Sequence, residues 1–86
     1  MSKARIMVGS AADTADIGTL VRRRRLANRL NQRELAELAG VGVRLVSELE
    51  RGKPTLRMDA VNRVLQVFGL KLGTIRIPRD IGDDER

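Results

Sequence analysis

The fold is decided by residues 32–52, which read QRELAELAGVGVRLVSELERG. Two short runs lie on either side of two glycines, and in each run apolar residues recur three and four positions apart, the spacing of one helix face. They are Leu35, Leu38 and Ala39 in the first run and Leu45, Val46 and Leu49 in the second. The pattern therefore predicts two amphipathic helices of about two turns each, joined by a tight turn.

The ends of the first of these helices carry residues that favour helix starts and stops. Asn31 is a good N-cap, and Glu34 three residues later reaches back to the N–H of the cap in a capping-box arrangement. Gly40 stands where a helix ends in a left-handed residue, a conformation that penalises any Cβ. Helices this short do not persist alone, so they must pack on each other, and the small Ala36 allows their axes to cross closely.

A helix, a short glycine-containing turn and a second helix form the helix-turn-helix pattern. The residues that fit it are Asn31-Gln32-x-Glu34-Leu35-Ala36-x-x-Ala39-Gly40-Val41 and, further on, Val46-Ser47-x-Leu49-Glu50-x-Gly52-Lys53. Over residues 17–69 the chain resembles the phage-repressor (Xre/Cro) helix-turn-helix family. The resemblance implies a mainly α fold, a four-helix phage-repressor-like domain whose third helix enters the major groove of DNA.

The composition fits a small domain that binds a polyanion. The chain has 86 residues, enough for one domain whose core is near the lower limit for independent folding. Residues 1–79 carry 16 basic and 7 acidic side chains, a net charge of +9, whereas residues 80–86 carry 1 basic and 4 acidic, a net charge of −3. A basic surplus of this kind on a small domain favours nucleic acid as the partner. A merely solvated basic surface is the other interpretation.

Several function classes lack the residues that they need. There is no Cys and no His, so we expect no disulfide, no metal site, no cofactor and no catalytic residues, because a nucleophile cannot be paired with a base. No apolar run is long enough to span a bilayer, and residues 1–8 do not form a secretory signal. We expect a cytoplasmic, nucleoid-associated protein that is not an enzyme and has no membrane partner.

The first helix belongs to a domain expected to cover residues 13–69. Residues 1–12 have no sustained period, so a flexible arm is expected before it. Asp13 or Thr14 caps this helix, which should run to about Arg29. Its inner side is expected to hold Ile17, Leu20, Val21 and Leu30.

Four consecutive arginines, Arg22 to Arg25, lie in this first helix. They spread around more than one turn and cannot all face one partner. The family resemblance implies that Arg25 turns inward and pairs with Glu50 at the end of the third helix. Removing one side of such a pair leaves a buried charge uncompensated, at a cost of about 3 to 5 kcal/mol. A basic face that is solvated throughout is the alternative.

A loop and a fourth helix follow the central pair. Gly52 suits a helix exit and Pro54 prevents continuation, so the next helix is expected from Met58 to Phe68. Its apolar stripe is Met58, Val61, Val64, Leu65 and Phe68, widened by Ala60 and Val67. Phe68 is the one aromatic residue and is expected to fill the core, since single-strand binders that stack bases use several exposed rings.

Residues 70–78 alternate apolar and polar side chains with a slip at Gly73, the pattern of a β-strand with a bulge. The sequence offers no second convincing strand to pair with it, so we expect it to pair with the same strand of another copy. A C-terminal β-strand pairing across a homodimer would bury Leu70, Leu72, Ile75 and Ile77. Residues 79–86 are expected to be a disordered tail.

The resemblance also assigns roles in DNA binding. The outward side chains of the third helix, expected to contact bases, are Val43, Arg44, Leu45, Ser47 and Glu48. Arg44 suits guanine O6 and N7, Glu48 would accept from cytosine N4, and the two apolar side chains would contact thymine methyl groups. The side chains expected at phosphates are Gln32, Arg33, Arg44, Arg51, Lys53 and Arg57. Gly42, Val43 and Leu45 replace polar residues that are common in the family, so part of the specificity should come from DNA shape.

The region after the third helix resembles HipB-like antitoxins, the DNA-binding halves of HipBA toxin–antitoxin modules. It consists of Arg51-Gly52-Lys53-Pro54-Thr55, one helix ending Val67-Phe68-Gly69-Leu70, and a strand in place of a fifth helix. The resemblance implies a homodimeric repressor that binds the palindromic operator DNA of its own operon and neutralises a HipA-like serine/threonine kinase toxin. The alternatives are a stand-alone Xre-family regulator without a toxin partner and, in another class, a basic RNA- or polyanion-binding accessory protein.

Overall fold

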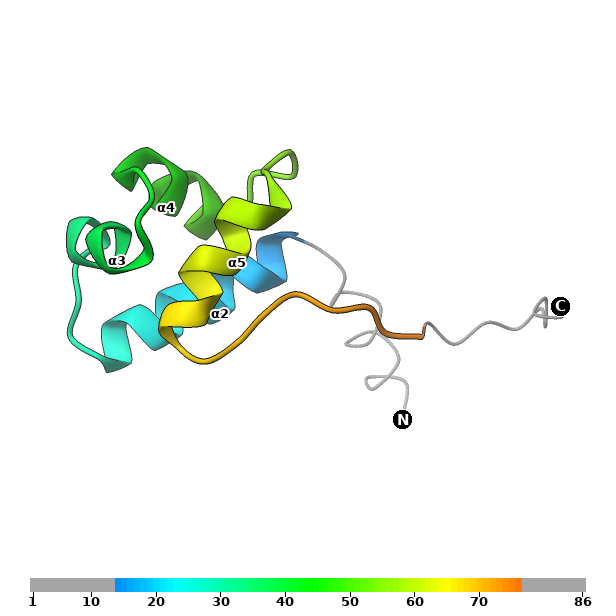
Figure 1. Ribbon diagram of the computed structural model, residues 1–86, viewed down its shortest axis with the longest axis horizontal. Helices are drawn as coiled ribbons and strands as arrows, with labels where there is room; N and C mark the ends of the chain where they lie inside the picture. Colours follow the sequence, from blue (N-terminus) through cyan, green and yellow to red (C-terminus); the bar gives the residue numbers. More distant parts are fainter. Residues whose placement is uncertain (1–13, 77–86) are drawn as a thin grey trace, which may run out of the picture.

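The structure, a computed structural model, describes residues 14–76. This range contains four helices, α2 (Thr14–Ala27), α3 (Gln32–Ala39), α4 (Val43–Glu50) and α5 (Met58–Val67), and no strand (Figure 1). The mainly α architecture expected from the sequence is therefore confirmed. The predictions of an arm at residues 1–12 and of a tail at residues 79–86 lie outside the described residues.

Helix α2 ends two residues before Arg29, where the sequence pattern places its end. Arg29 has a positive φ of 58°, and its N–H donates to the carbonyl of Leu26 at 3.0 Å. The carbonyl of Arg24 accepts from both the backbone N–H of Asn28 at 3.1 Å and the side-chain amide of Asn28 at 2.7 Å. An arginine in the left-handed conformation that glycine usually adopts thus ends α2 and directs the chain toward α3.

The turn between α3 and α4 has the geometry that the sequence predicts. The Asn31 side chain accepts from the N–H of Glu34 at 2.7 Å, and the Glu34 carboxylate accepts from the N–H of Asn31 at 2.8 Å, which completes the capping box. Gly40 follows α3 with a φ of 72°, and Gly42 is the N-cap of α4. Residues 40–42 alone join the two helices, whose axes cross steeply (Figure 1).

One core lies between the four helices. Its buried side chains are Val21, Leu35, Ala36, Val46, Leu49, Val61, Val64 and Leu65. Helices α2 and α4 approach closely at Gly18, where an added Cβ would overlap the backbone oxygen of Leu49 and lie 3.2 Å from the Cα of Glu50. Helix α4 is therefore held along its inner face and at its C-terminal end, and its opposite face is turned toward solvent.

Three apolar residues predicted for inner helix faces are not buried. Leu38 is 63% exposed, Met58 is 69% exposed and Leu20 is 37% exposed. Leu38 lies toward the outer side of α3, because Leu35 and Ala36 already fill the contact with the core. Met58 is the first residue of α5. Apolar spacing defines a broad face, and the core covers only the centre of that face.

The segment after α5 does not form a strand in this single chain. The chain turns at Gly69, which has a φ of 76°, and residues 70–76 continue without regular secondary structure (Figure 1). Leu70 and Leu72 pack against the core of their own domain, and the N–H of Leu72 donates to the side-chain oxygen of Asn62 at 2.7 Å. The first part of the predicted strand is thus attached to its own helices.

Two further predictions concern this end of the domain. Phe68 is half-buried and packs against the core, as predicted. Ile75, which was expected at the dimer interface, is 58% exposed in the single chain, and Ile77 lies outside the described residues. Because pairing across a dimer requires a second copy, that pairing stays a prediction.

Candidate nucleic-acid interface

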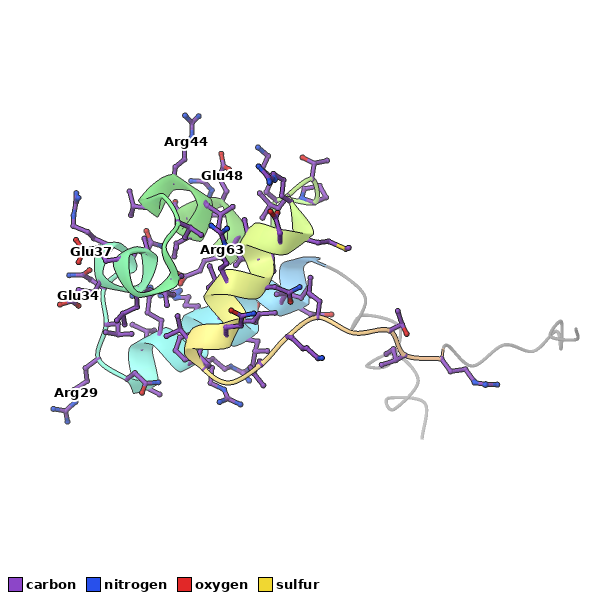
Figure 2. All side chains as sticks on the ribbon, in the orientation of Figure 1. Arg29, Glu34, Glu37, Arg44, Glu48 and Arg63 are labelled. Carbon is purple, nitrogen blue, oxygen red and sulfur yellow. The ribbon has the colours of Figure 1, made fainter. Side chains whose placement is uncertain are left out.

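The outer face of α4 carries the most protruding of the side chains assigned to bases. Val46 and Leu49 are fully buried, and Val43 is 39% exposed. Arg44 lies on the side of α4 opposite to Leu49, and its side chain is 89% exposed. Figure 2 shows Arg44 pointing away from the domain, with Glu48 also on the outer side of the helix. The first turn of α4 therefore exposes the Arg44 guanidinium group to solvent, while the opposite face of the helix is packed in the core.

Leu45 and Ser47, which are also predicted to contact bases, are both half-buried on α4. Leu45 is half-buried and packs against the core, and its contact with a thymine methyl group stays a prediction. Leu45 is half-buried because it lies one turn before the buried Leu49 and so on the same side of the helix. Ser47 is also half-buried, and its hydroxyl accepts from Nη1 of Arg51 at the long distance of 3.4 Å.

Glu48 joins two cations that the sequence treats separately. Its Oε2 lies 3.4 Å from Nε of Arg44 and 3.6 Å from Nζ of Lys53. Lys53 is also attached to the same residue through its backbone, because its N–H donates to the carbonyl of Glu48 at 3.0 Å. The Glu48 side chain is only 18% exposed between them. These three residues, called here the Glu48 cluster, connect the first turn of α4 to the loop that follows it.

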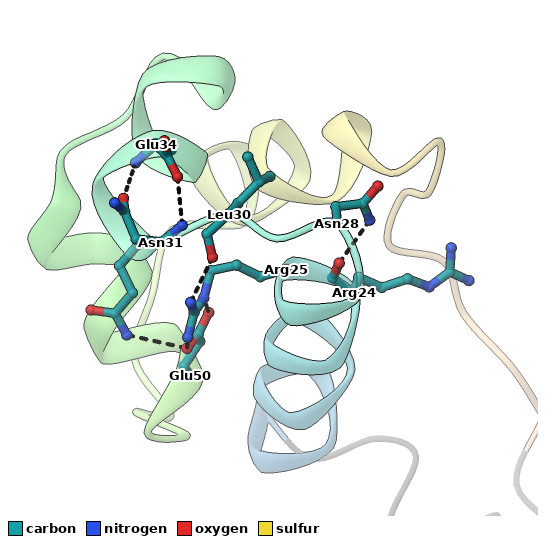
Figure 3. Close-up of polar contacts among 8 residues, drawn as sticks. Arg24, Arg25, Asn28, Leu30, Asn31, Glu34 and Glu50 are labelled. Atoms are coloured by element: carbon teal, nitrogen blue, oxygen red, sulfur yellow. Dashed lines mark hydrogen bonds and ion pairs between the residues drawn. The ribbon is translucent and has the colours of Figure 1, made fainter.

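A buried ion pair holds the C-terminal end of α4 against α2 (Figure 3). Arg25 donates from Nε and Nη2 to the two carboxylate oxygens of Glu50, at 2.7 and 3.0 Å, and from Nη1 to the carbonyl of Leu30 at 2.9 Å. The two side chains are 11% and 5% exposed. The hydrogen bonds to Glu50 raise the pKa of Arg25 by more than burial lowers it. The inward Arg25 implied by the family resemblance is present in the structure.

Gln32, which is predicted to contact a phosphate, forms a hydrogen bond with Glu50 in the structure, and its phosphate contact stays a prediction. Its side-chain amide donates to Oε1 of Glu50 at 3.1 Å and is half-buried, so one carboxylate accepts from both α2 and α3 (Figure 3). The backbone N–H groups of Gln32 and Arg33 lie in the first turn of α3, where a helix leaves such groups without partners of its own. That turn remains suited to an anion through its backbone.

The remaining predicted phosphate contacts differ in their surroundings. Arg33 and Arg51 are exposed. Arg57 donates from Nε and Nη2 to the carboxylate of Asp59, at 3.2 and 2.8 Å, and these bonds hold the pKa of Asp59 below its usual value.

Among residues 14–76 no three acidic, Cys or His side chains are gathered as a metal ion requires. None of the helices described has the length and apolar character needed to cross a bilayer.

Comparison with known proteins decides the family. Residues 16–75 match the family described as "Helix-turn-helix domain". The chain belongs to this family. Over 58 residues it is 50% identical to an "Uncharacterized HTH-type transcriptional regulator y4mF" of Sinorhizobium fredii (strain NBRC 101917 / NGR234), an alignment that covers 67% of this chain and 76% of the relative. The matched range of the helix-turn-helix domain contains α3, α4 and α5 and nearly all of α2.

One residue of this helix-turn-helix domain is not singled out by the sequence pattern. Gly18 lies inside α2, and the backbone of α4 at Leu49 and Glu50 occupies the place where its side chain would be. The signal that points to it is energetic, because glycine inside a helix costs about 1 kcal/mol relative to alanine. A glycine at such a position therefore indicates a close approach of another backbone.

Proposed function

We propose that this helix-turn-helix protein is a sequence-specific transcriptional regulator that binds double-stranded DNA. The observation that carries the proposal is the outer face of α4, where Arg44 is 89% exposed on a helix fixed from behind by Leu49 and Glu50. The major groove of DNA admits an α-helix, and an arginine on that helix can bond guanine O6 and N7 together. The printed name of the S. fredii relative, a transcriptional regulator, supports the same conclusion.

The roles within this proposal follow the burial of each side chain. Arg44 selects guanine, and the exposed Val43 contacts a thymine methyl group. Arg33, Arg51 and Lys53, which are exposed on the elements that flank α4, bind phosphates and set the register of α4 in the groove. Hydrogen-bonding groups for bases are few, so sequence-dependent DNA shape contributes to specificity.

The test is selection of duplexes from a random-sequence library by the purified protein. The expected result is an enriched palindrome bound more tightly than random duplex, with an affinity that falls with salt at a log–log slope of about −0.9 per phosphate contact. The matched control is single-stranded RNA of the same length. If random duplex or RNA competes as well as the selected sequence, the proposal fails and the polyanion-binding alternative is favoured.

We further propose that the protein is a homodimer and that the segment beyond Gly73 pairs with its counterpart in a second copy. Leu70 and Leu72 are already packed on their own domain, whereas Ile75 is 58% exposed and its neighbours form no strand among the described residues. The test is sedimentation of Ile75→Asp against Lys71→Asp, an exposed position outside the proposed contact. Only Ile75→Asp should yield monomers, and dimers of both variants would contradict the pairing.

We also propose that the regulator is the antitoxin of a HipBA-like module, which represses its own operon and neutralises a HipA-like serine/threonine kinase toxin. The support is the resemblance of residues 51–78 to HipB-like antitoxins, together with the absence of a fifth helix between α5 and Arg76. The test is purification of the tagged chain from its native host and identification of what remains bound. A bound kinase encoded beside this chain is the expected result.

The second candidate is a stand-alone regulator, which the plain regulator name of the S. fredii relative favours. The same purification separates the two functions. Operator DNA recovered without a kinase, from a locus that has no kinase-like neighbour, would contradict the antitoxin role and leave the stand-alone regulator.

A further inference from the structure

The Glu48 cluster places a carboxylate among the side chains proposed to contact DNA. A carboxylate at this position repels phosphate, so its presence weakens binding to any duplex. The contacts of the Glu48 carboxylate indicate a role that offsets this repulsion. Oε2 alone is shared by Arg44 and Lys53, and no described residue donates to Oε1. Glu48 therefore holds two cations with one oxygen and keeps the other as an acceptor.

The two cations are held at different strengths. Lys53 is bound to Glu48 through both its backbone N–H and its ammonium group, so this end of the loop stays against α4. Arg44 is bound only through Nε and is otherwise in solvent, with its terminal nitrogens available to a base edge. A pair of this exposure is worth little in stability, which points away from a role in holding the fold together.

We propose that Glu48 is a specificity-determining positioning residue, a conclusion that rests on the proposed DNA-binding function. On duplex of the wrong sequence, Glu48 keeps Arg44 and Lys53 occupied and so lowers their attraction to phosphates. At the selected sequence, the same contact steadies the Arg44 guanidinium so that its terminal nitrogens meet guanine, while Oε1 accepts from an amino group of a base. The carboxylate thus lowers affinity for all DNA and lowers it least for the right sequence.

The test compares Glu48→Gln with Glu37→Gln, measured on random duplex and on the sequence selected by the wild-type protein. Glu37 is an exposed carboxylate on α3, with no ion pair among the described residues, so its variant removes the same charge without the contact. Glu48→Gln should bind random duplex more tightly, with a salt slope steeper by up to about 1.8, since two cations each gain about 0.9 from a phosphate. The ratio of selected to random affinity should fall by about 5- to 150-fold, the fold-change that corresponds to about 1 to 3 kcal/mol of discrimination by one base contact.

A second measurement tests the inference on the protein without DNA. The mobility of the Arg44 Nε–H group, measured by NMR relaxation of the unbound protein, should rise in Glu48→Gln and stay unchanged in Glu37→Gln, while both variants melt like the wild type. Equal changes of the affinity ratio in the two variants, or an Arg44 that is equally mobile with and without Glu48, would overturn the inference alone. A wild-type protein that binds no duplex would overturn the proposed function and this inference with it.

Discussion

Helix α4 carries two glutamates, Glu48 and Glu50, and each binds an arginine in a different setting. The pair of Arg25 and Glu50 has two hydrogen bonds, at 2.7 and 3.0 Å, and side chains that are 11% and 5% exposed. The pair of Arg44 and Glu48 has one long contact at 3.4 Å and an arginine that is 89% exposed. The same two residue types therefore form a buried attachment at the C-terminal end of α4 and an exposed contact on its outer face.

The difference between the two pairs comes from solvent. Water competes with an exposed ion pair, so such a pair contributes only about 0 to 1 kcal/mol to the stability of the fold. A buried pair has no such substitute, because either charge left alone stays out of water. Helix α4 can then be fixed to α2 at its C-terminal end while the side chains on its outer face stay free to move.

The largest expected effect is the loss of stability when the ion pair that attaches α4 to α2 is broken. Glu50→Ala leaves Arg25 buried with only the carbonyl of Leu30 to accept from it, and it removes the acceptor of Gln32. The unfolding free energy should fall by about 3 to 5 kcal/mol, measured by urea denaturation. Glu48→Ala is the matched control and should change stability by less than about 1 kcal/mol. Similar melting of the two variants would contradict the contrast between the pairs.

A second substitution weakens the same contact between α2 and α4 without changing a charged residue. Gly18→Ala places a methyl group on the backbone of Leu49 and within 3.2 Å of the Cα of Glu50, and backbone atoms cannot turn aside as a flexible side chain can. Forcing α2 and α4 apart should cost about 1 to 3 kcal/mol in the same urea experiment. Gly73→Ala is the control, because nothing lies within 4 Å of the added Cβ. Equal stability of the two variants would show that the helices separate freely.

The features that the sequence predicts well depend on short stretches of chain. The capping box of Asn31 and Glu34 and the left-handed Gly40 are set by residues three to nine positions apart, so local chemistry is sufficient. The pair of Arg25 and Glu50 is the exception, since 25 residues separate its members. The family resemblance implies this pair, and no property of the two residues alone indicates it.

The features that the sequence does not predict depend on how helices are placed against each other. The close approach at Gly18 and the bond from Gln32 to Glu50 exist only once α2, α3 and α4 are assembled. The outward position of Leu38 has the same origin, because periodicity says which residues share a face but not how much of that face the core covers. The turn of the chain after Gly69 likewise brings Leu70 back onto its own core.

A third prediction concerns the outer face. On the proposed function, Arg44→Ala should weaken binding by about 1 to 3 kcal/mol at one base pair and relax the preference there. Arg51→Ala should weaken binding to all sequences alike and reduce the salt slope by about 0.9, because Arg51 binds phosphate. The measurement is affinity for the selected duplex and for each of its single-base variants. Equal profiles for the two substitutions would refute the separate roles.

The smallest effect is expected at a third arginine–carboxylate pair, Arg57 and Asp59, whose side chains are 81% and 56% exposed. The bond from Arg57 holds the pKa of Asp59 below its usual value, so the folded state binds this proton less tightly than the unfolded state does. The pair therefore stabilises the fold above the usual pKa of aspartate, about 3.9, and this stabilisation is lost as pH falls through the lowered value.

The measurement for this pair is an NMR titration of the Asp59 carboxyl group, since solvent makes the effect on unfolding too small to use. Arg57→Gln should raise the pKa of Asp59 toward its usual value, while the Asp59 carboxylate still accepts from the N–H of Ala60 at 2.8 Å. Arg63→Gln is the control, because Arg63 acts on Asp59 only through charge and contributes least to the shift. A pKa that responds equally to both substitutions would mean that an exposed pair is held by the general field of the arginines, and the contact between Arg44 and Glu48 would then need the same reinterpretation.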